Sequence, residues 1–373
     1  MTDFIHAFRN KETILALARQ IQQESSKLQA PFKIMEVCGG HTHSLMRYGL
    51  LDLLQNTPLE FVHGPGCPVC VMPKLRIDEA IALAQMPETI LITLADMMRI
   101  PGSVLSLQKA RALGADVRFA YSPLQALEIA RTNPLKNVVF VAIGFETTTP
   151  MTASLLLQAQ AEGLKNLFVH NNHVLVPPSV QAVLQNSKIH ALIAPSHVSV
   201  ITGAKIYQPL LERFQMPIVV AGFEPVDVLE GVLCLVRQAR QQETRLEIQY
   251  RRVVSFEGNL KAQSLIDQTM QVRQSFEWRG LGEIPFSAMQ MRAEFANFDA
   301  EVVFQEVLPK KSALEPKNCL CGQILKGQAK PLDCSLFNKT CTPSHPVGAC
   351  MVSSEGACAA YHKYGLDFSK KIG

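Results

Sequence analysis

The chain has 373 residues, 47% of them hydrophobic and 18% charged, which excludes an intrinsically disordered protein and predicts two or three domains. Its net charge is only +4 and its Lys and Arg residues are scattered, so nothing favours binding to nucleic acid or to a membrane. The longest apolar runs, such as residues 138–143, have the length of a strand and are too short to span a bilayer.

The first 30 residues predict an amphipathic helix that ends before Pro31. Charged residues alternate with apolar ones at helical spacing, which is typical of a surface helix and not of a secretory signal. We therefore expect a cytoplasmic chain. The apolar positions of this helix are Phe4, Phe8, Ile14, Leu17 and Ile21.

Short apolar strands then alternate with helices up to about residue 242. This alternation predicts α/β units with parallel sheets. The sequence Gly-Phe-Glu follows two of the strands and suggests two similar α/β lobes, with a ligand cleft between them at the carboxyl ends of the strands. Strands are expected at 33–37, 59–63, 89–93, 116–121, 137–143, 166–170, 191–194 and 218–221. Helices are expected at 42–55, 74–86, 103–113, 123–132, 148–162, 177–186, 203–213 and 225–242.

Residues 38–43, Cys-Gly-Gly-His-Thr-His, follow the first strand. A thiol at the start of a helix is expected to have a depressed pKa, which suits Cys38 as a nucleophile or metal ligand with His41 and His43 beside it. The structural alternative is a small buried Cys beside a tight turn, with the histidines capping the helix.

Residues 67–70 form a Cys-Pro-Val-Cys motif after a Gly-Pro-Gly turn. The spacing suits a redox dithiol, a pair of metal ligands with His63 as a third, or a structural turn. No second motif of this kind completes a four-thiolate zinc site, so we favour the redox pair Cys67 and Cys70.

Two carboxylates, Glu146 and Glu224, also follow strands. Each is able to orient a ligand or act as an acid or base, but each also suits a helix cap, and capping is the preferred interpretation for Glu224. Among the histidines at strand ends, His197 is the best functional candidate. Cys234 lies in the middle of a predicted helix and is expected in the core.

After residue 245 the alternation ends, and residues 310–346 are rich in Lys, Pro and Cys. A segment so poor in apolar residues needs a staple, and thiolates suit zinc or an iron–sulfur cluster. Irregular spacing and surplus cysteines favour [4Fe–4S], whereas disulfides are least expected in a reducing compartment. The proposed ligands are Cys321, Cys334, Cys341 and Cys358, with Cys319 and Cys350 unassigned.

Together these segments resemble the HypD family of [NiFe]-hydrogenase maturation factors, from about residue 33 to residue 364. The family has two α/β lobes around a cleft and a third, iron–sulfur domain, which we expect to pack with the amino-terminal helix. The segments that carry the resemblance are residues 35–43, 63–70, 144–148, 194–199, 221–225, 277–282 and 351–358.

The resemblance implies a scaffold with redox activity, rather than a conventional turnover enzyme, for assembling the Fe(CN)2(CO) moiety of the hydrogenase. Cys38 would bind this iron with the HypC chaperone, with His41 beside it, and HypE with HypF would donate cyanide. Cys67 and Cys70 would relay electrons from a [4Fe–4S] cluster on Cys321, Cys334, Cys341 and Cys358. Glu146 is included among the catalytic candidates.

The expected domains are residues 1–30, a helix on the C-terminal domain; 31–120, the first lobe, completed by 218–242; 121–217, the second lobe; and 243–373, the iron–sulfur domain. Two other functions stay open from the residues alone. One is a thiol–disulfide oxidoreductase with a [4Fe–4S] cluster, and the other is a zinc-stapled binding module.

Overall fold

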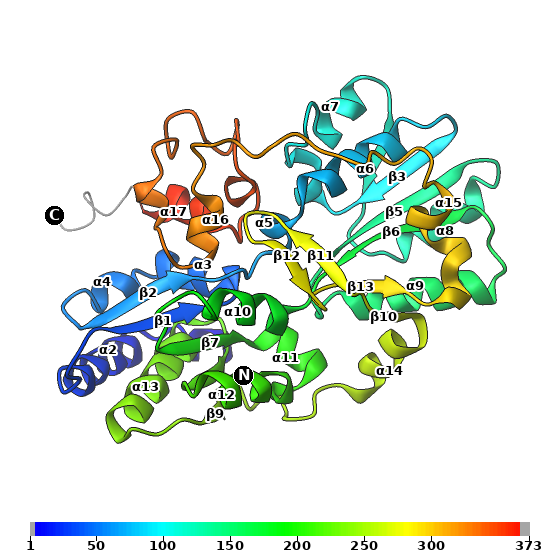
Figure 1. Cartoon of the computed structure of the whole chain (residues 1–373). Helices are drawn as coiled ribbons and strands as arrows, with labels where there is room; N and C mark the ends of the chain where they lie inside the picture. The colour runs from blue at the N-terminus through cyan, green and yellow to red at the C-terminus, as the bar shows by residue number, and fades with distance from the viewer. Residues whose placement is uncertain (1–3, 366–373) are drawn as a thin grey trace.

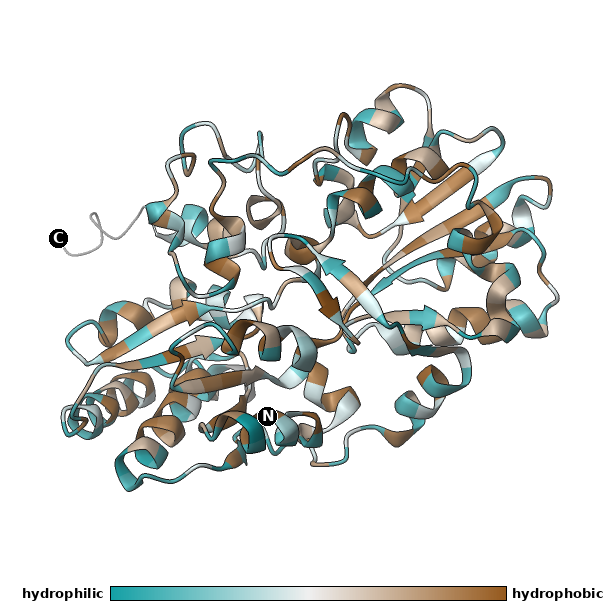
Figure 2. Cartoon of the chain, viewed as in Figure 1, coloured by the Kyte–Doolittle hydropathy of each residue, from teal (hydrophilic) through white to brown (hydrophobic). Residues whose placement is uncertain are grey.

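The computed structural model describes residues 4–365 and has two lobes, each built on a parallel β-sheet (Figure 1). The predicted α/β fold class is confirmed. Strands of both sheets are largely hydrophobic in Figure 2, and the residues of β3, β6, β7 and β8 are all buried. Such strands need helices on both faces of their sheet.

The sheet of the first lobe has five parallel strands in the order β2-β1-β7-β8-β9. They are β1 Phe32–Glu36, β2 Leu59–His63, β7 Ala191–Pro195, β8 Ile218–Ala221 and β9 Leu246–Ile248. The helices before β2 and those between β6 and β9 are α1 Phe4–Ala7, α2 Lys11–Ser25, α3 Gly39–Arg47, α4 Leu50–Leu53, α10 Val176–Leu184, α11 Ser196–Thr202, η2 Ala204–Tyr207, α12 Gln208–Phe214 and α13 Pro225–Gln241.

The sheet of the second lobe has four parallel strands in the order β4-β3-β5-β6. They are β3 Thr89–Thr93, β4 Asp116–Phe119, β5 Asn137–Gly144 and β6 Leu167–His173. The helices from β2 to β6 are α5 Pro68–Val71, α6 Lys74–Ala84, η1 Ala95–Arg99, α7 Leu107–Ala112, α8 Gln125–Thr132 and α9 Thr149–Ala161.

The sheets divide the chain differently from the expected ranges. The range 31–120 assigns β3 and β4 to the first lobe, but both pair within the second sheet. The range 121–217 assigns β7 to the second lobe, but it pairs with β1. The second lobe is therefore an insertion between β2 and β7. β8 and α13 do belong with the first lobe, as the range 218–242 anticipated.

The amino-terminal helix α2 packs against α13 of the first lobe and not on the C-terminal domain as predicted (Figure 1). Ala18 and Ile21 on α2 share one hydrophobic cluster with Val228 and Val232 on α13 and with Ile34 on β1. The apolar face of α2 is thus used to cover the first sheet.

The residues after β9 fall into two parts rather than one domain. The first part lies on the second lobe, where Met270, Met289 and Phe295 join the core beneath α9. Its elements are α14 Leu260–Thr269, β10 Met270–Val272, β11 Ser275–Trp278, β12 Gly282–Pro285, β13 Met289–Met291, η3 Ala293–Phe298 and α15 Ala300–Val303.

The second part, residues 316–365, holds the six C-terminal cysteines and is called the cysteine segment below. It packs on the first lobe, with α17 against α3 and α16 against β2. Its elements are α16 Cys321–Leu325, η4 Pro331–Asp333, η5 Ala349–Met351 and α17 Ala357–Tyr364. One buried core runs through both lobes and this segment, so the three parts are not separate bodies. No helix within residues 4–365 is both long and apolar enough to cross a membrane.

Candidate functional site

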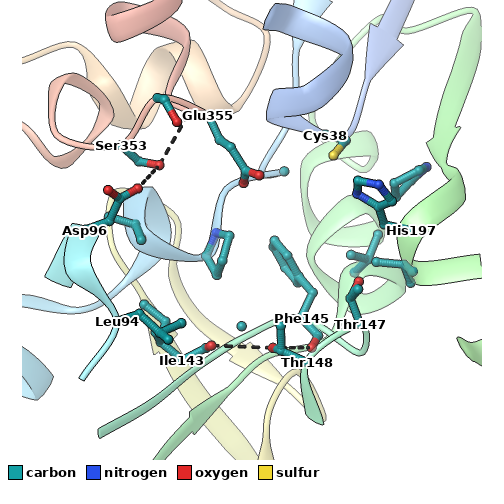
Figure 3. A pocket seen from close by; sticks show the side chains of 18 of the residues that line it. Cys38, Leu94, Asp96, Ile143, Phe145, Thr147, Thr148, His197, Ser353 and Glu355 are labelled. Atoms are coloured by element: carbon teal, nitrogen blue, oxygen red, sulfur yellow. Dashed lines mark hydrogen bonds between the residues drawn. The ribbon is translucent and has the colours of Figure 1, made fainter. Parts of the chain in front are cut away.

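A cavity of about 360 Å³ lies between the two lobes, at the carboxyl ends of β1 and β7 on one side and β3 and β5 on the other (Figure 3). This is the position expected for a ligand cleft in an α/β protein, and its volume suits a small ligand. The cysteine segment closes one wall through residues 353–355. The polar or charged side chains that face the cavity are Cys38, Asp96, Thr147, Thr148, His197, Ser353, Ser354 and Glu355.

Cys38 is the only thiol among the residues that line this interlobe cavity. It follows β1, adopts an extended backbone as the N-cap of α3, and donates its backbone N–H to Glu36 Oε2 at 3.1 Å. The loop before α5 presses against it, because a Cβ on Gly66 would lie only 2.5 Å from the Cys38 Cα. Only glycine permits this approach, so the backbone fixes the thiol at the cavity wall.

The expected depression of the Cys38 pKa is wrong for the metal-free chain. Burial raises the pKa of this thiol, and the negative charges of Glu355 and Glu36 raise it further. A hydrogen bond from the backbone of Gly40 acts in the opposite direction but is smaller. The free thiol is therefore neutral, and a bound cation is what would make it a thiolate.

His41 does not line the interlobe cavity, contrary to the expectation that it sits beside Cys38 as a working group. Its Nε2 donates to the backbone oxygens of Ala221 and Gly222 at 3.2 and 3.1 Å, and its ring packs on Phe223. Burial lowers the pKa of His41 to about 4, so the ring is neutral. Its Nδ1 is buried and has no hydrogen-bond partner.

His197 is the histidine that faces the interlobe cavity. Its ring also packs on Phe223, with the centroids 4.2 Å apart, and burial lowers its pKa. His43 lies elsewhere, where its Nε2 is 2.7 Å from the Tyr364 hydroxyl. Of the three histidines, only His197 has direct access to a ligand in the cavity.

Cys67 and Cys70 flank the short helix α5, and both side chains are buried. Cys67 Sγ accepts the Cys70 backbone N–H at 3.2 Å. Neither sulfur lines the interlobe cavity, although Pro68 and Val69 between them do. Cys70 Sγ lies 3.9 Å from the Ala349 backbone oxygen. The motif therefore lies between the interlobe cavity and η5 of the cysteine segment.

Five thiols gather in the cysteine segment, and they differ in part from the four expected ligands. Cys319 and Cys321 have their sulfurs 3.3 Å apart, and the side chains of Cys350 and Cys358 lie close enough to Cys321 for its thiol to shift the pKa of each. Cys341 lies within electrostatic range of Cys321 and accepts the Val347 N–H at 3.4 Å.

Cys334 is the expected ligand that stands apart in this structure. Its sulfur lies 3.8 Å from the Asn318 backbone oxygen. Among the described interactions, none joins it to another cysteine. Cys319 and Cys350, which the sequence left unassigned, are in the group instead.

The chemistry of this thiol group fits an iron–sulfur cluster. The donors are thiols only, three of them (Cys341, Cys350 and Cys358) are buried and two (Cys319 and Cys321) are partly buried, and Cys341 already accepts a backbone N–H as cluster ligands do. All ten cysteines, which lie within the described range, are free thiols. Within residues 4–365 no three His, Cys, Asp or Glu side chains are already arranged around one ion position.

Glu146 follows β5 but is buried behind the cavity wall rather than in it. Its Oε1 accepts the Val176 N–H at 3.0 Å, so it caps α10 and not the helix that follows it. Its Oε2 is buried without a partner, and burial raises the pKa of this carboxyl group to about 7. Glu224, expected as a cap, is the N-cap residue of α13, but its side chain makes no capping hydrogen bond and forms an ion pair with Arg9.

A buried hydrogen-bond chain connects Cys38 with α17, and the motif analysis missed it. Glu36 accepts from the Cys38 N–H and lies 2.5 Å from His63 Nδ1, whose Nε2 is 3.3 Å from the Tyr361 hydroxyl. Glu36 and His63 are 1% and 3% exposed, so these contacts are shielded from water. Glu36 is a carboxylate at the end of an apolar strand, and this was the one feature of the sequence that could have indicated the chain of contacts.

A second set of contacts joins the cysteine segment to the second lobe across the cavity. Ser353 Oγ donates to Asp96 Oδ2 at 2.9 Å (Figure 3). Arg99 donates to the Val352 backbone oxygen at 3.0 Å. Burial raises the pKa of Glu355, and the nearby charge of Asp96 contributes. These contacts hold residues 353–355 at the cavity.

A comparison with protein families matches the HypD family, described as "Hydrogenase formation hypA family", over residues 12–365. The chain belongs to the HypD family. It is 49% identical to the hydrogenase expression/formation protein HupD of Azotobacter chroococcum mcd 1, with 97% of each chain covered. It is 48% identical to the hydrogenase maturation factor HypD of Azotobacter vinelandii, again over 97% of each chain. Against HypD of Escherichia coli K12 the identity is 44%, over 97% of this chain and 98% of the relative.

Membership of the HypD family confirms the resemblance drawn from the motifs. It gives the chain a role in hydrogenase maturation. The HypD motifs at residues 38, 144–148, 195–198 and 353–355 contribute to one cavity, although they are far apart in the sequence.

Proposed function

We propose that this chain is the scaffold on which the Fe(CN)2(CO) moiety of [NiFe]-hydrogenase is assembled, with Cys38 as its iron anchor. The observation that carries the proposal is the position of Cys38 as the single thiol facing the interlobe cavity. Low-spin iron with cyanide and carbonyl ligands suits a soft thiolate ligand. As cargo, the iron would supply the positive charge that the Cys38 thiol needs to lose its proton.

The cavity lining supports a small diatomic ligand better than a large polar one. Apolar side chains such as Val37, Leu94 and Phe145 form much of the wall, and His197 and Thr147 supply polar groups. Cyanide nitrogens accept hydrogen bonds, and these two side chains have donors to offer. His41 does not take part in this, because its N–H donor is already used by backbone oxygens.

The proposed partners follow from membership of the maturation machinery. A cysteine of the HypC chaperone would share the iron with Cys38, and HypE with HypF would donate cyanide. Cys38 is only partly buried, so a partner residue has access to it. The other Hyp proteins would therefore meet the chain at the open side of the interlobe cavity.

We further propose that the cysteine segment holds a [4Fe–4S] cluster, with Cys321, Cys341 and Cys358 among the ligands. Such a cluster supplies or accepts single electrons. Cys334, the fourth expected ligand, would have to move toward the group, or Cys319 would take its place 3.3 Å from Cys321. The buried dithiol of Cys67 and Cys70 lies between this thiol group and the cavity. It would pass electrons from the cluster to the iron in the cavity.

Infrared spectroscopy of the anaerobic chain co-purified with HypC tests the anchor. The wild type is expected to show cyanide and carbonyl stretches, and Cys38→Ala is expected to lose them while it keeps its iron–sulfur absorption. Cys234→Ala is the matched control, because Cys234 lies on α13 outside the cavity lining and should change neither signal. Retention of the stretches in Cys38→Ala would reject the anchor role.

Metal analysis of the same preparations tests the cluster. The wild type is expected to contain about four irons and four sulfides per chain in the cluster, and Cys321→Ala is expected to lose them. Zinc without iron would support the zinc-stapled binding module instead. The free thiol–disulfide oxidoreductase is disfavoured, because Cys67 and Cys70 are only 3% and 1% exposed and a protein disulfide has no access to them.

A further inference from the structure

The turn between β11 and β12, residues 278–282, belongs to the segments that resemble the HypD family, yet the proposed function gives it no role. Trp278 in this turn is fully buried and donates its indole N–H to Ser287 Oγ at 2.8 Å. Its ring also packs on Phe145, which lines the interlobe cavity. The turn is therefore held in a fixed position by the core.

The backbone of this turn holds Arg279 against two neighbouring helices. The Arg279 N–H donates to the Val71 oxygen at 2.8 Å, which joins the hairpin of β11 and β12 to α5 (Figure 1). A Cβ on Gly280, which has φ +77°, would lie 2.6 Å from the Cα of Gly322, the residue after Cys321. Only glycine permits this approach. Arg279 thus lies next to α5 and to the start of α16.

The guanidinium of Arg279 is buried and only partly neutralised. The residue is 6% exposed, its Nη2 donates to Glu315 Oε2 at 2.9 Å, and its Nη1 has no hydrogen-bond partner among the described residues. The Glu315 side chain is 42% exposed, and within residues 4–365 it is also the acidic partner of the buried Lys74, at 3.8 Å. Two buried cations thus share one carboxylate that is open to water. Such a charge is costly to bury, so a second anion nearby would stabilise it.

The thiols of the cysteine segment are the groups on which this charge acts. The pKa of Cys319 is raised by its hydrogen bond with Cys321 and by burial, whereas the positive charge of Arg279 lowers it. A cluster bound by thiolates is negatively charged, and reduction makes it more so. A fixed positive charge beside the thiols therefore favours the reduced cluster over the oxidised one.

We propose that Arg279 is the counter-charge of the iron–sulfur cluster and raises its reduction potential. This inference rests on the proposed cluster in the cysteine segment. Arg279 binds no iron. It acts through its charge on the thiolate ligands and through the unpaired N–H groups of Nη1, which are able to donate to sulfur. Because a guanidinium keeps its proton in proteins, this compensation does not change with pH.

Potentiometric titration of the full chain tests the proposal, with electron paramagnetic resonance to follow the reduced cluster. Arg279→Gln removes the charge. At the wild-type midpoint potential, the ratio of reduced to oxidised cluster in this variant is expected to be about tenfold lower. Arg279→Lys keeps the charge and is expected to restore most of the ratio. Arg213→Gln removes an exposed charge from α12 and should leave the ratio unchanged.

Glu315→Gln is the matched variant, because it breaks the same ion pair but changes the charge in the opposite direction. It removes a negative charge from beside Arg279, so the ratio of reduced to oxidised cluster should rise above that of the wild type. A purely structural role of the ion pair predicts shifts of the same sign in both variants. Shifts of the same sign, or no shift in either variant, would overturn the proposal.

Glu315 lies in a loop and is partly open to solvent, so Glu315→Gln should fold even if Arg279→Gln loses its cluster. In that case a higher ratio in Glu315→Gln supports the proposal, and an equal or lower ratio overturns it. A wild type without any iron–sulfur signal would reject the cluster and this inference with it. Unshifted potentials in variants that keep their cluster would reject only the role of Arg279, so the two failures are distinct.

Discussion

Glu146 shows how burial makes a single carboxyl group sensitive to pH. Its pKa rises from 4.5 to about 7 because the charged form is desolvated. Between these two values the folded chain keeps a proton that the unfolded chain has lost, so stability falls as the pH rises through this interval. Above about pH 7 the buried carboxylate is charged, and the full loss of stability caused by its desolvation is present.

Glu146→Gln is therefore expected to be more stable than the wild type at pH 8, by about 1–3 kcal/mol, since one pKa unit corresponds to about 1.4 kcal/mol. The amide oxygen of Gln is still able to accept the Val176 N–H. Urea unfolding at pH 8 and pH 5 measures the difference, which should shrink at the lower pH. Parallel pH profiles for the two proteins would contradict this account.

The sequence predicted the position of Cys38 better than it predicted the surroundings of the other candidate residues. Cys38 follows a strand and starts a helix, so its place at the strand end was predictable from local pattern. The orientation of His41 was not, because it depends on backbone oxygens at residues 221 and 222, far along the chain. Cys319 and Cys350 could not be assigned, because spacing alone does not say which thiols a loop brings together.

At the scale of elements, a buried ion pair holds the start of α13 to the chain that follows β9. Asp227 is 0% exposed and accepts two hydrogen bonds from the Arg252 guanidinium, at 2.8 and 2.6 Å. The guanidinium also lies 4.0 Å from the ring centroids of both Phe8 and Tyr250. One side chain thereby ties three segments together.

Arg252→Ala is expected to lower the free energy of unfolding by about 2 kcal/mol, because it leaves a buried carboxylate without its charged partner. Urea denaturation is the suitable measurement, since it does not screen charge. Lys205→Ala removes an ion pair with Glu257 that is exposed to solvent, and should cost less than about 1 kcal/mol. Equal losses in the two variants would show that burial of Asp227 does not decide the effect.

Most strands were predictable because parallel strands in these sheets are short, apolar and bounded by loops. The helix predicted at 42–55 is in fact α3 and α4, separated by Gly49 at φ +63°, a conformation that suits glycine and ends a helix. Helix α11 was missed, since β-branched residues and a Pro-Ser-His start give it little helical signal. Its position is decided by packing against the first sheet.

For the whole molecule, removing the proposed cluster is expected to loosen one part of the chain and leave the rest unchanged. The cysteine segment has only short helices, whereas the sheets of both lobes are buried between helices. Hydrogen exchange should therefore rise across residues 316–365 and at α5 when a chelator removes the cluster, and stay slow in β3, β5 and β6. Exchange that rises equally in the second sheet would contradict a local staple.

The assignment of strands to lobes could not be predicted at this scale. Each strand has a similar apolar pattern, so the local sequence does not determine whether β3 pairs with β5 or with β2. The pairing of β1 with β7 joins residues far apart in the sequence, and only the tertiary packing selects it. The same holds for α2, because an apolar helix face does not by itself specify the surface that it covers.

The insertion of one lobe into the other has a consequence for how the protein is made. As the ribosome delivers the chain, all four strands of the second sheet are available by residue 173, whereas the first sheet lacks β9 until residue 248. Until β7 emerges, one edge of β1 has bare backbone groups that invite pairing with other nascent chains. The amino-terminal strands β1 and β2 are thus synthesised first, but their sheet is completed last. During this interval a chaperone would have to shield the unpaired edge of β1.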